Sequence, residues 1–140
     1  MDIRAYQRWF EEYDRARGWD RVEPCHVLAH LVEEVGEIAR HVLRLDGYRD
    51  LSEDERQAEI EQLAMEINDA FVFLTKLAIC YNLELADILA KGQAKAEART
   101  NVEEGRREMA RYLEARRRRL QALVEGDAVA VEDGDSSSKE

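Results

Sequence analysis

Two segments of the chain repeat apolar residues at alternating steps of three and four, and this period restricts the fold more than any other feature. The more regular series has seven apolar positions: Ile60, Leu63, Ile67, Ala70, Leu74, Leu77 and Tyr81. The series after Pro24 has five: Leu31, Val35, Ile38, Val42 and Leu45. This period places apolar side chains on one helix face, so that two antiparallel helices can bury a continuous stripe. The sequence therefore predicts long helices over about 24–45 and 52–81, packed against each other.

The rest of the first hundred residues also favours helices. One proline and seven glycines leave long stretches of good helix formers in a chain of 140 residues, and sustained two-residue alternation typical of strands is hard to find. Helical spacing predicts further helices over about 3–17, ending at Gly18, and over 84–100. Ser52 and Glu55 form a capping-box pattern at the start of the third helix. We therefore expect an all-α fold.

The composition divides the chain into three parts. Residues 1–100 contain the four helices of the expected bundle core. Residues 101–125 place apolar side chains at helical spacing among many arginines, which predicts an extra amphipathic helix with a solvated arginine face. Residues 126–140 combine acid, serine and glycine with too little apolar content to fold, which predicts a disordered acidic tail.

The charge and the cysteines limit the classes of partner and the compartment. A formal charge of -10 at pH 7 disfavours nucleic acid as a general partner, because a phosphate backbone needs a basic surface. Cys25 and Cys80 lack the close spacing of metal or redox motifs, so we expect buried free thiols in a reducing compartment. We find no segment apolar enough to span a membrane and no secretory signal, and we expect a cytoplasmic protein.

Two pairs of carboxylates lie inside the two apolar series. Glu34 and Glu37 are three residues apart, as are Glu66 and Asp69, so each pair projects from one helix face. Two such helices, packed together, would aim four carboxylates at a common point. Magnesium prefers carboxylates and water as ligands and usually holds substrate phosphates in its remaining positions. The four residues therefore predict a metal site that handles phosphate.

Each carboxylate pair alone has a simpler interpretation, which is a solvated helix face. Both pairs, however, border the apolar series. Glu34 and Glu37 are next to Val35 and Ile38, and Glu66 and Asp69 are next to Ile67 and Ala70. Like charges that converge there would raise one another's pKa and destabilise the fold. Either a bound cation or protonation of some carboxylates removes this conflict, and we favour the cation.

Residues 5–100 resemble the all-α nucleotide pyrophosphohydrolases of the MazG type, whose signature is ExxE followed after a variable gap by ExxD. The matching segments are EEVGEIA at 33–39 and EINDAFVFLTKLA at 66–78. The spacing between them is similar to that of the dCTP pyrophosphatase branch, as is RGWD at 17–20. KGQAKAEAR at 91–99 resembles the basic segment that closes the site in this family.

The resemblance implies a four-helix MazG-like bundle core and hydrolysis of a nucleoside triphosphate between the α and β phosphates, giving a monophosphate and pyrophosphate. It implies Mg²⁺ as the cofactor, with Mn²⁺ as a substitute, and a role in nucleotide-pool sanitation. Phosphate binding would fall to Lys91, Lys95 and Arg99. The chain departs from the family at Gln93 and Ala98, where asparagine and arginine are common.

Further roles follow from position along the helices. Either Glu37 or its neighbour Glu33 could accept the proton of the attacking water, with Glu33 otherwise supporting the metal ligands. Phe73, one turn after Asp69, and Trp19 could stack on a nucleobase or belong to the core.

Other aromatic and imidazole side chains have simpler interpretations. We expect Trp9 and Phe10 to be core residues. His30 and His41 share the face of the first carboxylate pair, but histidines beside a helical core usually satisfy a hydrogen bond, so we expect them, like His26, not to be metal ligands.

A second function class stays open. A helical assembly or regulatory protein could retain this scaffold and use the helix at 101–125 to bind a partner. In either case a short helical protomer would leave apolar surface exposed, and the resemblance implies dimers or tetramers, so we expect a homo-oligomer.

Overall fold

A computed structural model describes residues 2–99 and 101–135. For Tyr48 and for residues 127–135 it describes the backbone only. Its elements are α1 (Ile3–Arg17), η1 (Trp19–Arg21), α2 (Pro24–Leu43), η2 (Arg44–Tyr48), α3 (Glu53–Cys80), α4 (Leu85–Arg99) and α5 (Val102–Asp135). The residues described contain helices and no strand, which confirms the all-α prediction. The chain forms two compact units, which divide between Gly92 and Gln93 within α4.

The helix ends follow the signals in the sequence. Helix α1 ends at Gly18, whose φ of 68° lies in the left-handed region that glycine adopts at low cost. Pro24 occupies the first turn of α2. At the start of α3, the Ser52 side chain accepts a hydrogen bond from the Glu55 backbone, and the Glu55 side chain accepts one from the Ser52 backbone. The predicted capping box is confirmed.

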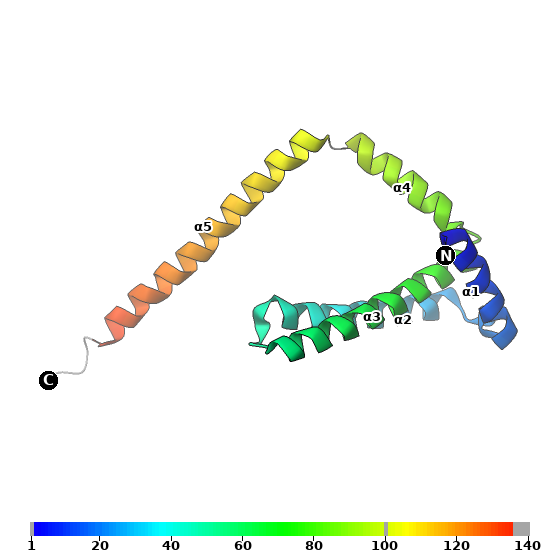
Figure 1. Cartoon of the computed structure of the whole chain (residues 1–140), viewed down its shortest axis with the longest axis horizontal. Helices are drawn as coiled ribbons and strands as arrows, with labels where there is room; N and C mark the ends of the chain where they lie inside the picture. The colour runs from blue at the N-terminus through cyan, green and yellow to red at the C-terminus, as the bar shows by residue number, and fades with distance from the viewer. Residues whose placement is uncertain (1, 100, 136–140) are drawn as a thin grey trace. The chain divides into compact units, whose positions relative to one another are not determined.

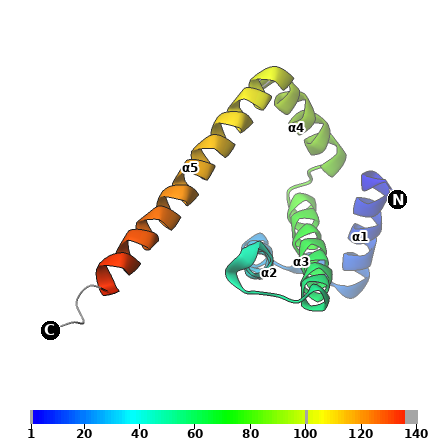
Figure 2. The same ribbon diagram turned by 60° about the vertical axis from the view of Figure 1, so that its left-hand side comes forward.

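Helices α2 and α3 run side by side and form the body of the first unit (Figure 1). The short π-helical element η2 leads out of α2, and Gly47 within it has a φ of 97°. Helix α1 lies against η1 and α3 (Figure 2). Buried apolar side chains are few in the part of the chain that the structure describes: Phe10, Val27, Ala70 and Ala78. The core therefore lies where α1, the start of α2 and the second half of α3 meet.

Only half of each predicted apolar stripe points into the protomer. On α3, Leu63, Ala70 and Leu77 are buried or half-buried, and the same holds for Leu31 and Ile38 on α2 and for Leu45 in η2. The alternate positions of the two series are exposed: Val35 and Val42 on α2, Ile60, Ile67 and Leu74 on α3, and Tyr81 directly after α3. Together with the exposed Leu28, one step of seven before Val35, they form what we call the outer stripe. The prediction of continuous burial was wrong for one protomer, because two helices cover each other on one side only.

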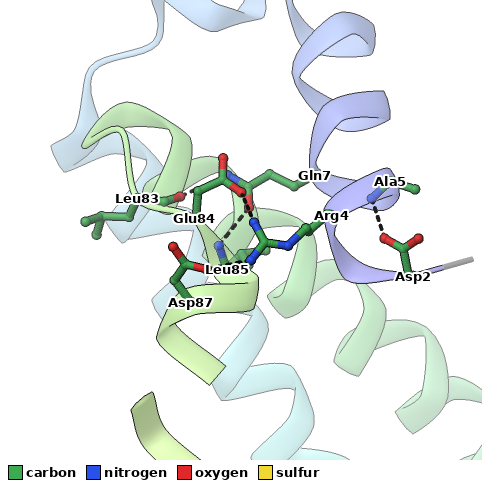
Figure 3. Close-up of polar contacts among 8 residues, drawn as sticks. All are labelled: Asp2, Arg4, Ala5, Gln7, Leu83, Glu84, Leu85 and Asp87. Carbon is green, nitrogen blue, oxygen red and sulfur yellow. Dashed lines mark hydrogen bonds and ion pairs between the residues drawn. The ribbon is translucent and has the colours of Figure 1, made fainter. Parts of the chain in front are cut away.

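The start of α4 is held to α1 by polar contacts (Figure 3). The buried Gln7 side chain donates a hydrogen bond to the Leu83 carbonyl at 2.9 Å and accepts one from the Leu85 backbone at 2.8 Å. Arg4 forms exposed ion pairs with Glu84 and Asp87. A single amide side chain thus satisfies two backbone groups at the turn that precedes α4.

Replacing Gln7 by alanine should lower the free energy of unfolding by about 1–3 kcal/mol, because two part-buried backbone groups lose their partner. Arg4→Ala is the control, since its ion pairs are exposed and we expect a loss of at most about 1 kcal/mol. Urea unfolding followed by circular dichroism measures both. Equal losses for the two variants would contradict the role given to Gln7.

Helix α5 is longer than predicted. Helix α5 continues to Asp135, ten residues past the predicted end at 125, because the segment after Gly126 includes alanines and contains no proline. The remainder of the predicted tail, 136–140, lies outside the described residues.

Cys25 is exposed and Cys80 half-buried, and both are free thiols, so the burial predicted for Cys25 was wrong. Within the described residues, no helix is long and apolar enough to cross a membrane.

Candidate metal centre

The four predicted carboxylates converge from α2 and α3. One ligand oxygen each from Glu34, Glu66 and Asp69 lies within 4.8 Å of the others, and all three side chains are half-buried. Glu37 joins a second group with Glu66 and His41, again within 4.8 Å. The cause is local: a step of three residues places each pair on one face, and α2 and α3 turn these faces toward each other. Glu66 belongs to both groups.

The electrostatic cost of this convergence falls on Glu34. Burial raises the pKa of Glu34, and the negative charges of Asp69 and Glu66 raise it further. A hydrogen bond with the Glu66 carboxyl acts in the same direction, since two carboxyl groups can share a hydrogen bond only if one holds a proton. A dication between these oxygens would remove the need for that proton.

The other two glutamates of α2 differ in what they contact. Glu37 is half-buried and forms an ion pair with Arg40 on the same helix. Glu33 is exposed, and one of its oxygens lies 2.8 Å from His30 Nδ1. The structure therefore brings Glu37 into the cluster and leaves Glu33 at its edge, beside His30.

His41 enters the cluster from α2, although its sequence position suggested only a structural role. Its side chain is 4% exposed, and Nδ1 lies 2.5 Å from Glu59 Oε2. Arg44 also donates to Glu59, at 2.7 Å. The hydrogen bond from His41 lowers the pKa of Glu59 most, with Arg44 adding to the effect. The sequence carried a signal for this position, because His41 follows Glu37 by one helical turn.

An aromatic cavity of about 500 Å³, within the size range of ligand pockets, is lined by His30, one helical turn before Glu34, and by Asn68, the neighbour of Asp69. Both predicted base-binding residues, Trp19 and Phe73, line it. The rings of Phe73 and His30 stack with their centroids 5.3 Å apart. Trp9 and Phe10 also line the cavity, and Trp9 is 48% exposed, so the prediction that Trp9 is a core residue was wrong.

The polar part of the cavity wall contains a buried ion pair. Lys76 Nζ lies 2.7 Å from Asp14 Oδ2 and donates a hydrogen bond to the Trp19 carbonyl at 2.8 Å. Asn68, next to Asp69, adds an exposed amide to the lining. Sequence reasoning missed Asp14 and Lys76, because nothing in their local pattern separates them from the many other charged residues.

The three predicted phosphate-binding residues are exposed on α4. They recur at steps of four, so they share one helix face. Lys91 belongs to the first unit, whereas Lys95 and Arg99 belong to the second. Their proximity to the carboxylates therefore stays a prediction.

Comparison with known proteins adds one relative. The chain is 29% identical over 102 residues to the uncharacterized protein YvdC of Bacillus subtilis (strain 168), a match that covers 71% of this chain and 96% of YvdC. No family model and no solved structure matches the chain. The similarity thus spans nearly the whole length of a smaller protein.

Proposed function

We propose that this protein is a magnesium-dependent nucleoside triphosphate pyrophosphohydrolase that releases a monophosphate and pyrophosphate and removes unwanted nucleotides. The observation that carries the proposal is the convergence of Glu34, Glu66 and Asp69 within 4.8 Å, with Glu37 in the adjoining group. The aromatic cavity supplies a place for a base. Carboxylates for a hard dication and aromatic rings for a base together match the two ends of a nucleotide.

The donor set fits magnesium. Glu34, Glu66 and Asp69 would hold the ion, with Glu37 completing the set, and all four are hard oxygen donors. Burial and the charges of Asp69 and Glu66 raise the pKa of Glu34, and a bound dication would offset both effects. When bound, magnesium supplies Lewis-acid polarisation of the phosphate oxygens, and Mn²⁺ can take its place.

The chain's own residues carry the remaining steps. The rings of Trp19 and Phe73 bind the base between aromatic surfaces and orient the triphosphate toward the carboxylates. A Glu37 carboxylate oxygen accepts a proton from the water that attacks the α-phosphorus. The bond from the α-phosphorus to the bridging oxygen breaks, and pyrophosphate leaves with that oxygen. Lys91, Lys95 and Arg99 are the groups that we assign to the leaving pyrophosphate. Glu33 holds His30 at the cavity wall.

A panel of ribonucleoside, deoxyribonucleoside and damaged triphosphates tests the function. Each is incubated with the full chain, with and without Mg²⁺, and pyrophosphate and monophosphate are quantified. We expect equal amounts of the two products from at least one triphosphate, and only with the dication. Phosphate in place of pyrophosphate, or no release from any member of the panel, would refute the proposal.

We further propose a homo-oligomer, in which a second copy covers the outer stripe. Val35 and Ile67 are 52% and 53% exposed, and their neighbours at steps of seven are exposed as well. A stripe with this repeat suits packing against a helix of the same kind. The exposed apolar residues of α5, among them Met109 and Leu113, equally favour the second function class, an assembly protein that binds a partner through this helix.

Light scattering after gel filtration tests the oligomer. We expect the parent to elute with a mass of at least two protomers and Val35→Glu to shift toward the monomer, because a charge in an apolar interface loses its hydration. Leu123→Glu on α5 is the matched control. A change in mass with Leu123→Glu alone would move the interface to α5 and favour the assembly protein.

A further inference from the structure

His41 is a buried polar group that the proposed reaction does not use. Its side chain is 4% exposed, and Nε2 has no hydrogen-bond partner among the described residues. A buried polar atom without a partner destabilises the fold, because it has lost its hydrogen bonds to water. Such a cost at the edge of a carboxylate cluster suggests that the atom has a partner that is not part of the chain.

The hydrogen bond at Nδ1 determines which nitrogen of His41 can bind a ligand. Glu59 accepts from Arg44 Nη1 at 2.7 Å and lies 2.5 Å from His41 Nδ1. A carboxylate that pairs with arginine is an acceptor, so Nδ1 carries the proton in this hydrogen bond. In the neutral ring, Nε2 then holds a lone pair. A carboxylate on one ring nitrogen and a metal on the other is the common arrangement of histidine ligands in proteins.

The distances around Nε2 suit a bound ion. Nε2 lies 3.9 Å from Glu66 Oε1, which is too far for a hydrogen bond. One ion can join two such atoms up to about 4.2 Å apart, twice a metal–ligand bond of about 2.1 Å. Glu37 completes the group, in which one ligand atom each of Glu37, His41 and Glu66 lies within 4.8 Å of the others. One imidazole nitrogen and two carboxylate oxygens therefore lie close together between α2 and α3.

We propose that His41, Glu37 and Glu66 bind a divalent transition metal, with Zn²⁺ as the probe ion, at a position next to the oxygen-only site of Glu34, Glu66 and Asp69. An imidazole ligand favours transition metals over magnesium, whose ligands in proteins are oxygens. The inference rests on the proposed function, because the transition-metal site shares Glu66 and Glu37 with the proposed magnesium site. It adds a ligand of a different chemical type and a metal preference.

Nitrogen NMR of the full chain tests the site with His41 and its neighbours unchanged. The chain has three histidines, so their ring ¹⁵N signals can be assigned with single variants of His26 and His30. We expect Zn²⁺, added without nucleotide, to shift the Nε2 signal of His41 while Nδ1 keeps its proton. If the Nε2 signal stays in place at saturating Zn²⁺, His41 serves only to neutralise Glu66 and the inference is wrong.

Calorimetry of variants gives the second measurement. His41→Phe should weaken Zn²⁺ binding at least tenfold, and Glu59→Gln about 10–100-fold, because the support of the imidazole is lost. Mg²⁺ binding should persist in both, since Glu34, Glu66 and Asp69 remain. His26→Phe, at an exposed position of the same helix, is the matched control and should bind Zn²⁺ like the parent. Loss of Zn²⁺ affinity in the control alone would overturn the assignment.

The two proposals fail in different ways. A parent chain that releases no pyrophosphate, but whose His41 signal shifts with Zn²⁺, would refute the function and leave the transition-metal site in place. Magnesium-dependent release of pyrophosphate with an unchanged His41 signal would support the function and refute the transition-metal site.

Discussion

Glu66→Gln should lower the rate of magnesium-dependent pyrophosphate release at least about 100-fold. Loss of a residue that only supports a metal ligand lowers activity by up to about 100-fold, and we expect loss of a ligand to cost at least as much. Glu66 supplies an oxygen to both ligand groups, so its loss weakens both at once. The amide keeps the size of the side chain and one acceptor oxygen but removes the charge. Turnover of the best triphosphate from the panel, at saturating Mg²⁺, measures the loss.

The stability of this variant separates a metal ligand from a structural residue. Without dication, Glu66→Gln should unfold at the same or a higher temperature than the parent, because one of three converging charges is gone. Mg²⁺ should raise the unfolding temperature of the parent and leave that of the variant unchanged. Glu61→Gln, exposed on the same helix, is the control and should behave like the parent in both measurements. A fully active Glu66→Gln would place the site elsewhere.

Asp14→Ala should lower the free energy of unfolding by about 3–5 kcal/mol, because it leaves the Lys76 ammonium buried without its partner. The two side chains are 7% and 10% exposed and lie 2.7 Å apart. The exposed pair of Glu11 and Arg15 also spans 2.7 Å, so Glu11→Ala is a matched control with an expected loss of at most about 1 kcal/mol. Denaturant unfolding at one protein concentration, with chelator present, compares the two.

A double variant completes this test. Asp14→Leu combined with Lys76→Met removes both charges and fills similar volume, and such replacements are often neutral or stabilising. We therefore expect the double variant to be more stable than Asp14→Ala. If it is equally unstable, the loss comes from packing around Asp14 and not from an unpaired charge.

The sequence predicted the helices well because their signals are local. Gly18, Pro24 and Ser52 act through the backbone within one turn, and each lies at the helix end that its chemistry favours. The carboxylates Glu34 and Glu66 were also predictable, since spacing along each helix fixes the face.

Contacts between distant segments could not be predicted in the same way. Whether Val35 or Ile38 points inward depends on how α2 rotates against α3, and a period of three and four fits either choice. The pairing of Asp14 with Lys76 joins two helices that are far apart in the sequence. His41 lay on the predicted face, but its free nitrogen becomes visible only once Glu59 occupies the other one.

The wall of the cavity at Trp19–Arg21 is a single turn of 3-10 helix, and Trp19 is 51% exposed. Among the residues that the structure describes, one hydrogen bond ties this turn to α3: Lys76 Nζ donates to the Trp19 carbonyl. Short segments with few buried contacts open at a small free energy, well below that of global unfolding. Binding of a molecule in the cavity would therefore slow amide hydrogen exchange at 19–22 first. The melting temperature of the whole unit would rise only at higher occupancy.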